Sequence, residues 1–135
     1  MPERERVRSS WFNNRVVSPL VMASGATDRL TVRGRRTGAE RTVPLHVLEV
    51  DGERYLVAPR GEVEWVQNLR AAGEARLHRR GRPAERIGVE EITDERRPAL
   101  IDQYKERWGR EVVDFWSQLP RPEQHPVFRV VPPPP

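Results

Sequence analysis

Three arginines, Arg35, Arg36 and Arg41, lie on either side of a Thr37-Gly38 pair in the sequence GRRTGAERTVPL, residues 34–45. The guanidinium group is charged at any working pH and offers a planar fork of donors, which suits phosphate or carboxylate. Arginines crowded around one tight turn repel one another unless an anion lies between them. The stretch therefore predicts an anion-binding turn between two strands, to which Thr37 and the Gly38 backbone add neutral donors.

The residues that follow this turn could hold a flat ring. Pro44 has no N–H, so within a strand it belongs at an edge or bulge, where a ligand can approach the backbone. A helix starting near Glu62, just after Arg60-Gly61, would direct backbone N–H groups toward the same region. Trp65 and Asn68 are three residues apart on that helix and share a face. An aromatic plane beside an amide suits a heterocycle, but from spacing alone a solvated basic hairpin with a core tryptophan is an equally good interpretation.

Side chains for nucleophilic or metal chemistry are missing. The chain has no cysteine, and its three histidines, at positions 46, 78 and 125, lack the spacing of metal ligands. Glu90 and Glu91 are adjacent on a predicted strand and must face opposite sides of it. We therefore assign no metal site and no catalytic residue. Enzymes whose cofactor carries the chemistry need mainly to hold that cofactor, and this kind of enzyme fits the sequence best.

The bulk composition favours an anionic small-molecule partner. The chain has 135 residues, a net charge of +4 and a sequence pI of about 10.5, which fits one basic domain. Charge alone would also suit nucleic acid, but Tyr55 is the only aromatic residue between positions 24 and 60. Binders of single strands need aromatic residues interleaved with the charges. We therefore expect no nucleic-acid partner.

The order of predicted elements indicates an α+β fold. Strands are expected at residues 30–33, 41–50, 54–58, 75–79, 84–92 and 126–131, and helices at 62–72, 93–108 and 111–119. Asp51-Gly52 predicts a hairpin turn, and Gly73 a helix end. Five or six short, mainly antiparallel strands hide their edges best in a small barrel.

Three segments are expected along the chain. Residues 28–132 would form the barrel and residues 133–135 a disordered tail. Residues 1–27 would form an amphipathic helical segment. This segment would pack on the domain or rest on a membrane surface, and the sequence leaves both uses open.

Two linked motifs resemble the deazaflavin-dependent nitroreductase family of actinobacteria. They are GRRTGAERTVPL at residues 34–45 and DGERYLVAPRGEVEWVQNLRAAG at residues 51–73, and HPVFRVVP at 125–132 is similar to the family's last strand. The resemblance implies a split β-barrel of the flavin-binding type and the deazaflavin coenzyme F-420, with FMN as the alternative. It also implies an oxidoreductase that transfers hydride from the reduced coenzyme to a small electrophile such as a quinone, an enone or a nitro compound.

The resemblance also implies roles for individual residues. Arg35, Arg36 and Thr37 would meet the acidic tail of the coenzyme, and Arg41 and Arg60 its phosphate region. The backbone of Thr42, Val43, Pro44, Leu45, Ala58 and Pro59 would line the ring, with Gly61 at the helix start and Trp65 and Asn68 on the helix side. The family's C-terminal tyrosines are not evident, and Phe115 and Trp116 would occupy that area. This departure argues against nitroimidazole reduction more than it argues against binding of the coenzyme.

Other properties follow from the resemblance only by analogy. Related split barrels include proteins that carry a flavin, haem or a fatty acid without turnover, so a non-enzymatic binder is the alternative function. Flavin-type split barrels are often homodimers. The expected location is the cytoplasm, with peripheral contact at the inner face of the cell membrane through residues 1–27 where quinones are the substrates.

Overall fold

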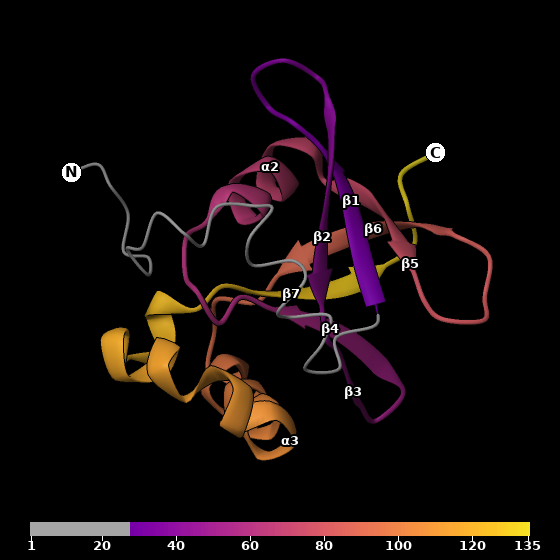
Figure 1. Ribbon diagram of the computed structural model, residues 1–135. Helices are drawn as coiled ribbons and strands as arrows, with labels where there is room; N and C mark the ends of the chain where they lie inside the picture. Colours follow the sequence, from indigo (N-terminus) through magenta and orange to yellow (C-terminus); the bar gives the residue numbers. More distant parts are fainter. Residues whose placement is uncertain (1–27) are drawn as a thin grey trace.

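The computed structural model describes residues 28–135, and the helical segment expected over residues 1–27 lies outside them. Its seven strands form one antiparallel sheet in the order β2-β1-β5-β6-β7-β4-β3 (Figure 1). The strands are β1 (Asp28–Arg33), β2 (Glu40–Leu45), β3 (Val47–Val50), β4 (Glu53–Val57), β5 (Glu74–His78), β6 (Glu85–Glu91) and β7 (Val127–Val131). The helices are α2 (Glu64–Ala72), α3 (Arg96–Gln118) and the short η2 (Pro122–Gln124).

One bent segment supplies both edges of the sheet. The single strand expected over residues 41–50 is wrong in one respect, because it breaks at His46 into β2 and β3. β2 pairs with β1 at one end of the strand order and β3 pairs with β4 at the other. Since these edge strands are consecutive in the chain, the sheet must curl until its two edges approach each other. The predicted α+β split barrel is thereby confirmed.

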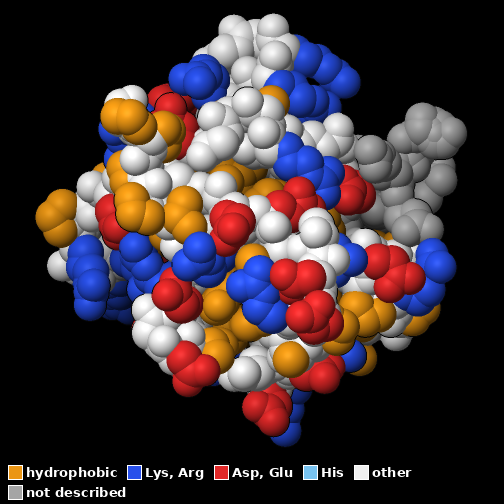
Figure 2. Space-filling model, turned by 180° about the vertical axis from the view of Figure 1, so that it is seen from behind, with side chains coloured by type: hydrophobic (Ala, Val, Ile, Leu, Met, Phe, Trp, Pro, Cys, Tyr) orange, Lys and Arg blue, Asp and Glu red, His pale blue; other side chains and the backbone are white. Residues whose placement is uncertain are grey.

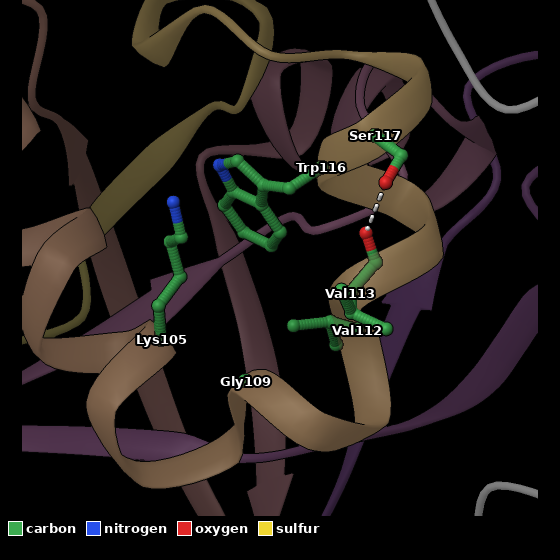
Figure 3. A pocket seen from close by; sticks show the side chains of 6 residues that line it. All are labelled: Lys105, Gly109, Val112, Val113, Trp116 and Ser117. Atoms are coloured by element: carbon green, nitrogen blue, oxygen red, sulfur yellow. Dashed lines mark hydrogen bonds between the residues drawn. The ribbon is translucent and has the colours of Figure 1, made fainter.

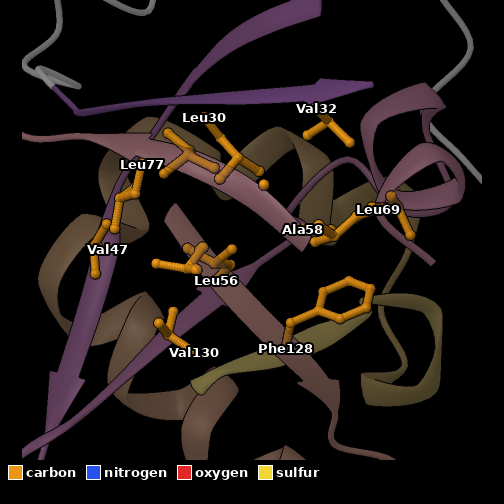
Figure 4. Packing of buried hydrophobic residues seen from close by; sticks show 13 residues of the cluster. Leu30, Val32, Val47, Leu56, Ala58, Leu69, Leu77, Phe128 and Val130 are labelled. Atoms are coloured by element: carbon orange, nitrogen blue, oxygen red, sulfur yellow. The ribbon is translucent and has the colours of Figure 1, made fainter. Parts of the chain in front are cut away.

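The barrel interior is apolar because alternate residues of each strand point inward. Leu30, Leu56, Leu77 and Phe128 are fully buried there and point toward one another in Figure 4. The opposite face of β3, β4 and β7 packs a second apolar cluster against α3, which includes Leu48, Tyr55, Val57, Leu100, Ile101 and Val112. This part of the sheet is therefore covered on both faces, which fixes α3 beside the bend at His46.

The helix ends follow the signals expected from the sequence. Gly73 ends α2 with a left-handed φ of 73°, and its N–H donates to Leu69 O at 2.8 Å. Before α3, Asp94 Oδ1 accepts the Arg96 N–H at 3.0 Å. Hydrogen bonds from the Arg96 side chain and backbone lower the pKa of Asp94 to about 2. The two helices expected on either side of residue 110 meet within α3 at a kink, where Trp108 has non-helical backbone angles (φ −128°, ψ 19°).

Several surface arginines form salt bridges with carboxylates. Arg70 bridges Glu62 and Glu91, and Arg129 bridges Glu53 and Glu90. Figure 2 shows positive and negative side chains interleaved over one face of the molecule. Between residues 28 and 135, no helix has the length and apolar character needed to cross a membrane.

Candidate cofactor-binding site

The arginine turn, residues 34–39, is a closed loop between β1 and β2, and it projects beyond α2 in Figure 1. Gly34 and Ala39 close it through Gly34 N–H to Ala39 O at 2.7 Å, and Gly38 N–H donates to Gly34 O at 3.0 Å. Gly38 has a φ of 80°, which a residue with a Cβ rarely adopts. Thr37 Oγ1 accepts the Ala39 N–H at 3.2 Å. The Thr37 hydroxyl oxygen therefore shapes the turn as an acceptor, and its contact with a ligand stays a prediction.

Arg35 and Asn68 fasten the turn to α2. Asn68 Oδ1 accepts the Arg35 backbone N–H at 3.1 Å and Arg35 Nη1 at 2.7 Å, and the same Nη1 lies 2.8 Å from Glu64 Oε1. The structure thus brings together two predicted site residues that are 33 positions apart. The Glu64 carboxylate balances the charge of Arg35, so the role of Arg35 that the structure shows is to anchor the turn.

Arg36 and Arg41 differ from Arg35 in their surroundings. Both are exposed, and neither forms a salt bridge with a carboxylate of residues 28–135. Arg41 lies opposite Val32 in the ladder and therefore on the barrel-facing side of β2, together with Val43 and Leu45. These two guanidinium groups are the cations that an anionic ligand would meet.

The four residues 42–45 do not present one common face. Val43 and Leu45 pack into the barrel core, whereas Thr42 and Pro44 face outward. Thr42 Oγ1 lies 2.8 Å from Thr31 Oγ1, which lies 3.0 Å from His78 Nε2. This network lines an outer hollow of about 430 Å3 together with Arg29, Glu40 and Arg76. A single ligand can therefore use residues 42–45 only through their backbone, at the edge of β2 that no described strand covers.

The segment 58–61 offers fewer free amides than its sequence suggests. Ala58 N–H donates to Pro126 O at 2.9 Å, Gly61 N–H to Ala58 O at 3.2 Å, and Val63 N–H to Gly61 O at 2.8 Å. The helix begins at Glu64 rather than near Glu62. The anion site expected at the helix N-terminus therefore has fewer unbonded backbone N–H groups to offer. The Glu64 carboxylate lies in the first turn of the helix, where its negative charge disfavours a bound anion. Pro59 and Arg60 are half-buried, with Arg60 Nε shielded from solvent.

Trp65 and Asn68 share the barrel side of α2, but neither forms an open platform. Trp65 is half-buried against the core, with its ring centroid 6.3 Å from that of Phe128 and tilted by 52°. Asn68 is buried beneath Arg35. Trp65 is therefore a wall of the barrel, and its contact with a coenzyme stays a prediction.

A cluster around His46 is absent from the sequence-based site. His46 Nε2 lies 2.9 Å from Glu111 Oε1, and its ring stacks on Trp108 with centroids 4.4 Å apart and planes 7° apart. Tyr104 is buried beside Trp108, and burial together with the Glu111 charge raises the Tyr104 pKa. The one sequence signal was the place of His46 two residues after Pro44. Its partners, about sixty positions away on a helix, could not be read from spacing.

His125 ties α3 to the segment that starts at Ala58. It is fully buried, with Nδ1 3.1 Å from Ala58 O and Nε2 2.6 Å from Leu119 O. Its ring stacks on Trp116 at 3.9 Å. Burial lowers the His125 pKa, and the hydrogen bonds to backbone carbonyls oppose that shift. Trp116, expected near the substrate, is thus packed between Tyr104 and His125.

The kink of α3 opens a small apolar hollow. Figure 3 shows Lys105 on one half of the helix and Trp116 on the other, with Gly109 between them. The hollow measures about 250 Å3 and is also lined by Val112, Val113 and Ser117. Lys105 Nζ lies 5.5 Å from the Trp116 ring centroid. Exposed Val113 makes this the one place in the described chain where a large apolar side chain faces solvent.

The described residues fit an anionic organic ligand better than a metal. Residues 28–135 hold no group of three His, Asp or Glu side chains able to bind a metal ion. Arg36 and Arg41 instead offer exposed cations, and Arg41 lies on β2, whose outer edge no described strand covers. A coenzyme with phosphate, carboxylates and a ring that can hydrogen-bond to backbone matches these donors.

Comparison with solved structures shows the same fold in several proteins. "F420-H2 Dependent Reductase (FDR-A)" shares 23% identity over 76% of this chain and 91% of its own, with a TM-score of 0.60. A structure described as a domain-swapped dimer shares 19% identity over 86% of this chain and 95% of its own, with a TM-score of 0.61. HutZ, the haem storage protein of Vibrio cholerae, shares 12% identity over 87% of this chain and 90% of its own, with a TM-score of 0.58. A comparison with curated proteins gave no significant match.

The family model for F420H(2)-dependent quinone reductases matches residues 4–120, which is most of the chain. This match confirms the resemblance seen in the two motifs, and with it an oxidoreductase that uses the deazaflavin coenzyme F420. The chain belongs to the F420H(2)-dependent quinone reductase family.

Proposed function

We propose that this enzyme reduces a quinone, or a related small electrophile, and that Arg36 and Arg41 hold its deazaflavin coenzyme. The observation that carries the proposal is the pair of exposed guanidinium groups beside the open edge of β2. When bound, the reduced deazaflavin supplies a hydride. The chain itself then has to bind the coenzyme's anions, orient its ring and receive the substrate.

Each part of the candidate site contributes to one of these tasks. Arg36 and Arg41 pair with phosphate or carboxylate oxygens, and Thr37 donates its hydroxyl proton. Arg35 keeps the turn in place through Asn68. Backbone groups of residues 42–45 bond to the ring edge from the edge of β2 that no strand of residues 28–135 covers. Ala58, Pro59, Arg60 and Gly61 border the other side, with Trp65 behind them.

A quinone is favoured as the substrate over a nitro compound. The family is described by quinone reduction, and no tyrosine lies on the second half of α3. The α3 residues that border the bend at His46 are instead Tyr104, Trp108 and Glu111. Aromatic walls suit a flat, apolar quinone ring.

The test is a titration of the pure protein with oxidised coenzyme F420, followed by coenzyme fluorescence. Binding at micromolar levels is expected, and no binding would overturn the proposal. Arg41→Ala should weaken binding by about 1.5–3 kcal/mol, the usual value of a charged hydrogen bond, or roughly 10–150-fold. Arg80→Ala is the matched control. Arg80 is exposed, and this substitution removes the same charge from the hairpin at the opposite end of β1. Equal affinities of the two variants would show that Arg41 is not a contact.

We also propose peripheral membrane contact through residues 1–27, since long-chain quinones reside in membranes. Pelleting with anionic liposomes should carry down the full chain and not a chain that starts at residue 28. Light scattering at several protein concentrations would test the proposed homodimer in the same preparations.

A further inference from the structure

We propose that His46, held by Glu111, is the general acid that delivers a proton to the reduced substrate. This inference rests on the proposed function and adds the proton donor to it. A quinone that accepts a hydride becomes a hydroquinone monoanion. One proton on the remaining oxygen completes the hydroquinone, while the imidazolium becomes a neutral imidazole.

His46 lies next to the proposed ring site along the chain. It is the residue at which the bent segment leaves the β1 side of the sheet and enters β3, directly after Leu45. Residues 42–45 are the proposed lining of the coenzyme ring. The donor is therefore the next side chain along the backbone from the proposed site of hydride transfer, on the face that α3 covers.

A continuous run of rings connects His46 to the other proposed ring-lining segment. Trp108 stacks on His46, and Tyr104 lies 5.0 Å from Trp108 and 6.1 Å from Trp116 by ring centroids. Trp116 stacks on His125, whose Nδ1 lies 3.1 Å from Ala58 O. Both proposed walls of the ring site thus border one α3 cluster, and a substrate that approaches from this side meets His46.

The surroundings of His46 suit proton transfer rather than metal binding. Its Nε2 lies 2.9 Å from Glu111 Oε1, a carboxylate placed to accept a hydrogen bond from the imidazole. The side chains of His46 and Glu111 are 11% and 27% exposed, so the pair is sheltered while Glu111 keeps contact with water. Such a carboxylate can return the proton from solvent after each turnover.

The charged and titratable groups packed around this pair are few. Tyr104 lies 6.5 Å from the His46 ring by centroids. Arg107 lies beyond Trp108, with its Cζ 5.9 Å from the Trp108 ring centroid. Among the described residues, Glu111 is therefore the group in direct contact with the imidazole.

The first experiment asks whether a quinone lies against His46. Diethyl pyrocarbonate labels accessible imidazoles, and peptide mass spectrometry gives the rate at each histidine. With reduced coenzyme absent, 2-methyl-1,4-naphthoquinone should slow labelling of His46 severalfold and leave His78 unchanged, because His78 lies on the outer face of β5. Equal protection of both, or of neither, would overturn the proposal.

The second experiment measures single-turnover oxidation of bound, reduced coenzyme by the same quinone. His46→Gln should keep coenzyme affinity within about twofold and slow the reaction by roughly 10²–10⁴-fold, the range of general acid catalysis. Glu111→Gln should slow the reaction and change its pH profile, because it removes the carboxylate that contacts the imidazole. Glu106→Gln, on the same helix and exposed, is the matched control.

The outcomes separate this inference from the proposed function. A wild-type protein that neither binds nor oxidises the coenzyme would overturn the function itself. A wild-type reaction matched within about threefold by His46→Gln, with the same pH profile, would overturn only the role of His46. If His46→Gln does not fold, an unchanged pH profile in Glu111→Gln would overturn that role.

Discussion

Asn68 is the buried side chain that fastens the arginine turn to α2, so its truncation tests the architecture of the site. Its Oδ1 accepts two hydrogen bonds from Arg35, one from the backbone N–H at 3.1 Å and one from the guanidinium at 2.7 Å. Asn68 is 6% exposed, so water cannot readily replace it. Asn68→Ala therefore removes both bonds and leaves the backbone N–H of half-buried Arg35 without this acceptor.

The magnitude follows from the two bonds. A neutral hydrogen bond contributes about 0.5–1.5 kcal/mol and one to a charged group about 1.5–3 kcal/mol. In the variant, Arg35 Nη1 still has its salt bridge to Glu64 Oε1 at 2.8 Å, and the Arg35 side chain is 20% exposed to water. Part of the contribution of the charged hydrogen bond is therefore retained. We expect a loss of about 2 kcal/mol in the free energy of unfolding, or roughly 8 °C in Tm for a domain of this size.

The assay is thermal unfolding followed by circular dichroism, with amide exchange over residues 34–39 as a local readout. Asn68→Asp keeps an acceptor oxygen beside Arg35 and should restore most of the stability. Gln103→Ala, which truncates an exposed amide on α3, should change Tm by no more than about 1–2 °C. The reasoning is refuted if Asn68→Ala unfolds within that same margin of the wild type, or if Asn68→Asp is as unstable as Asn68→Ala.

Two further predictions concern the barrel and its lock on α3. A Cβ at Gly88 would lie 2.5 Å from Pro132 O, so Gly88→Ala should destabilise the protein by about 1–3 kcal/mol in urea unfolding. Gly109→Ala, where nothing lies closer than 3.9 Å, should have no such cost, and equal effects would contradict the packing argument. Because the unfolded chain takes up a proton near pH 6.5 and folded His125 resists it, stability should fall as the pH drops below 6.5, by up to about 1.4 kcal/mol per pH unit. His125→Gln should flatten that slope between pH 7 and 5, and an unchanged slope would assign it to other groups.

Local signals in the sequence predicted most of the elements correctly. The alternation of apolar residues located the strands, Asp51-Gly52 the hairpin and Gly73 the end of α2, because each depends on a few neighbouring residues. The break at His46 was not predicted, since residues 41–50 are rich in β-branched and apolar residues throughout. Only closure of the barrel decides that β2 and β3 pair with different strands.

The candidate site was likewise predicted in part by local sequence signals and in part decided by the fold. The motif at residues 34–45 supplied the arginines and, through its resemblance to a family, the identity of the coenzyme. It could not show that Arg35 is balanced by Glu64 and Asn68 while Arg36 and Arg41 remain exposed. The pairing of a turn with a helix some thirty residues away depends on how the barrel places α2 beside it.

The sequence by itself determined the elements, the cationic turn, the absence of cysteine chemistry and the family. These are written in residue types and short spacings, which act locally. The tertiary structure decided which arginine anchors the turn, which face each residue of β2 presents, and that His46 meets Glu111 and Trp108. These contacts join segments far apart in the chain, and they exist only because the curled sheet and the kinked α3 close over the same bend.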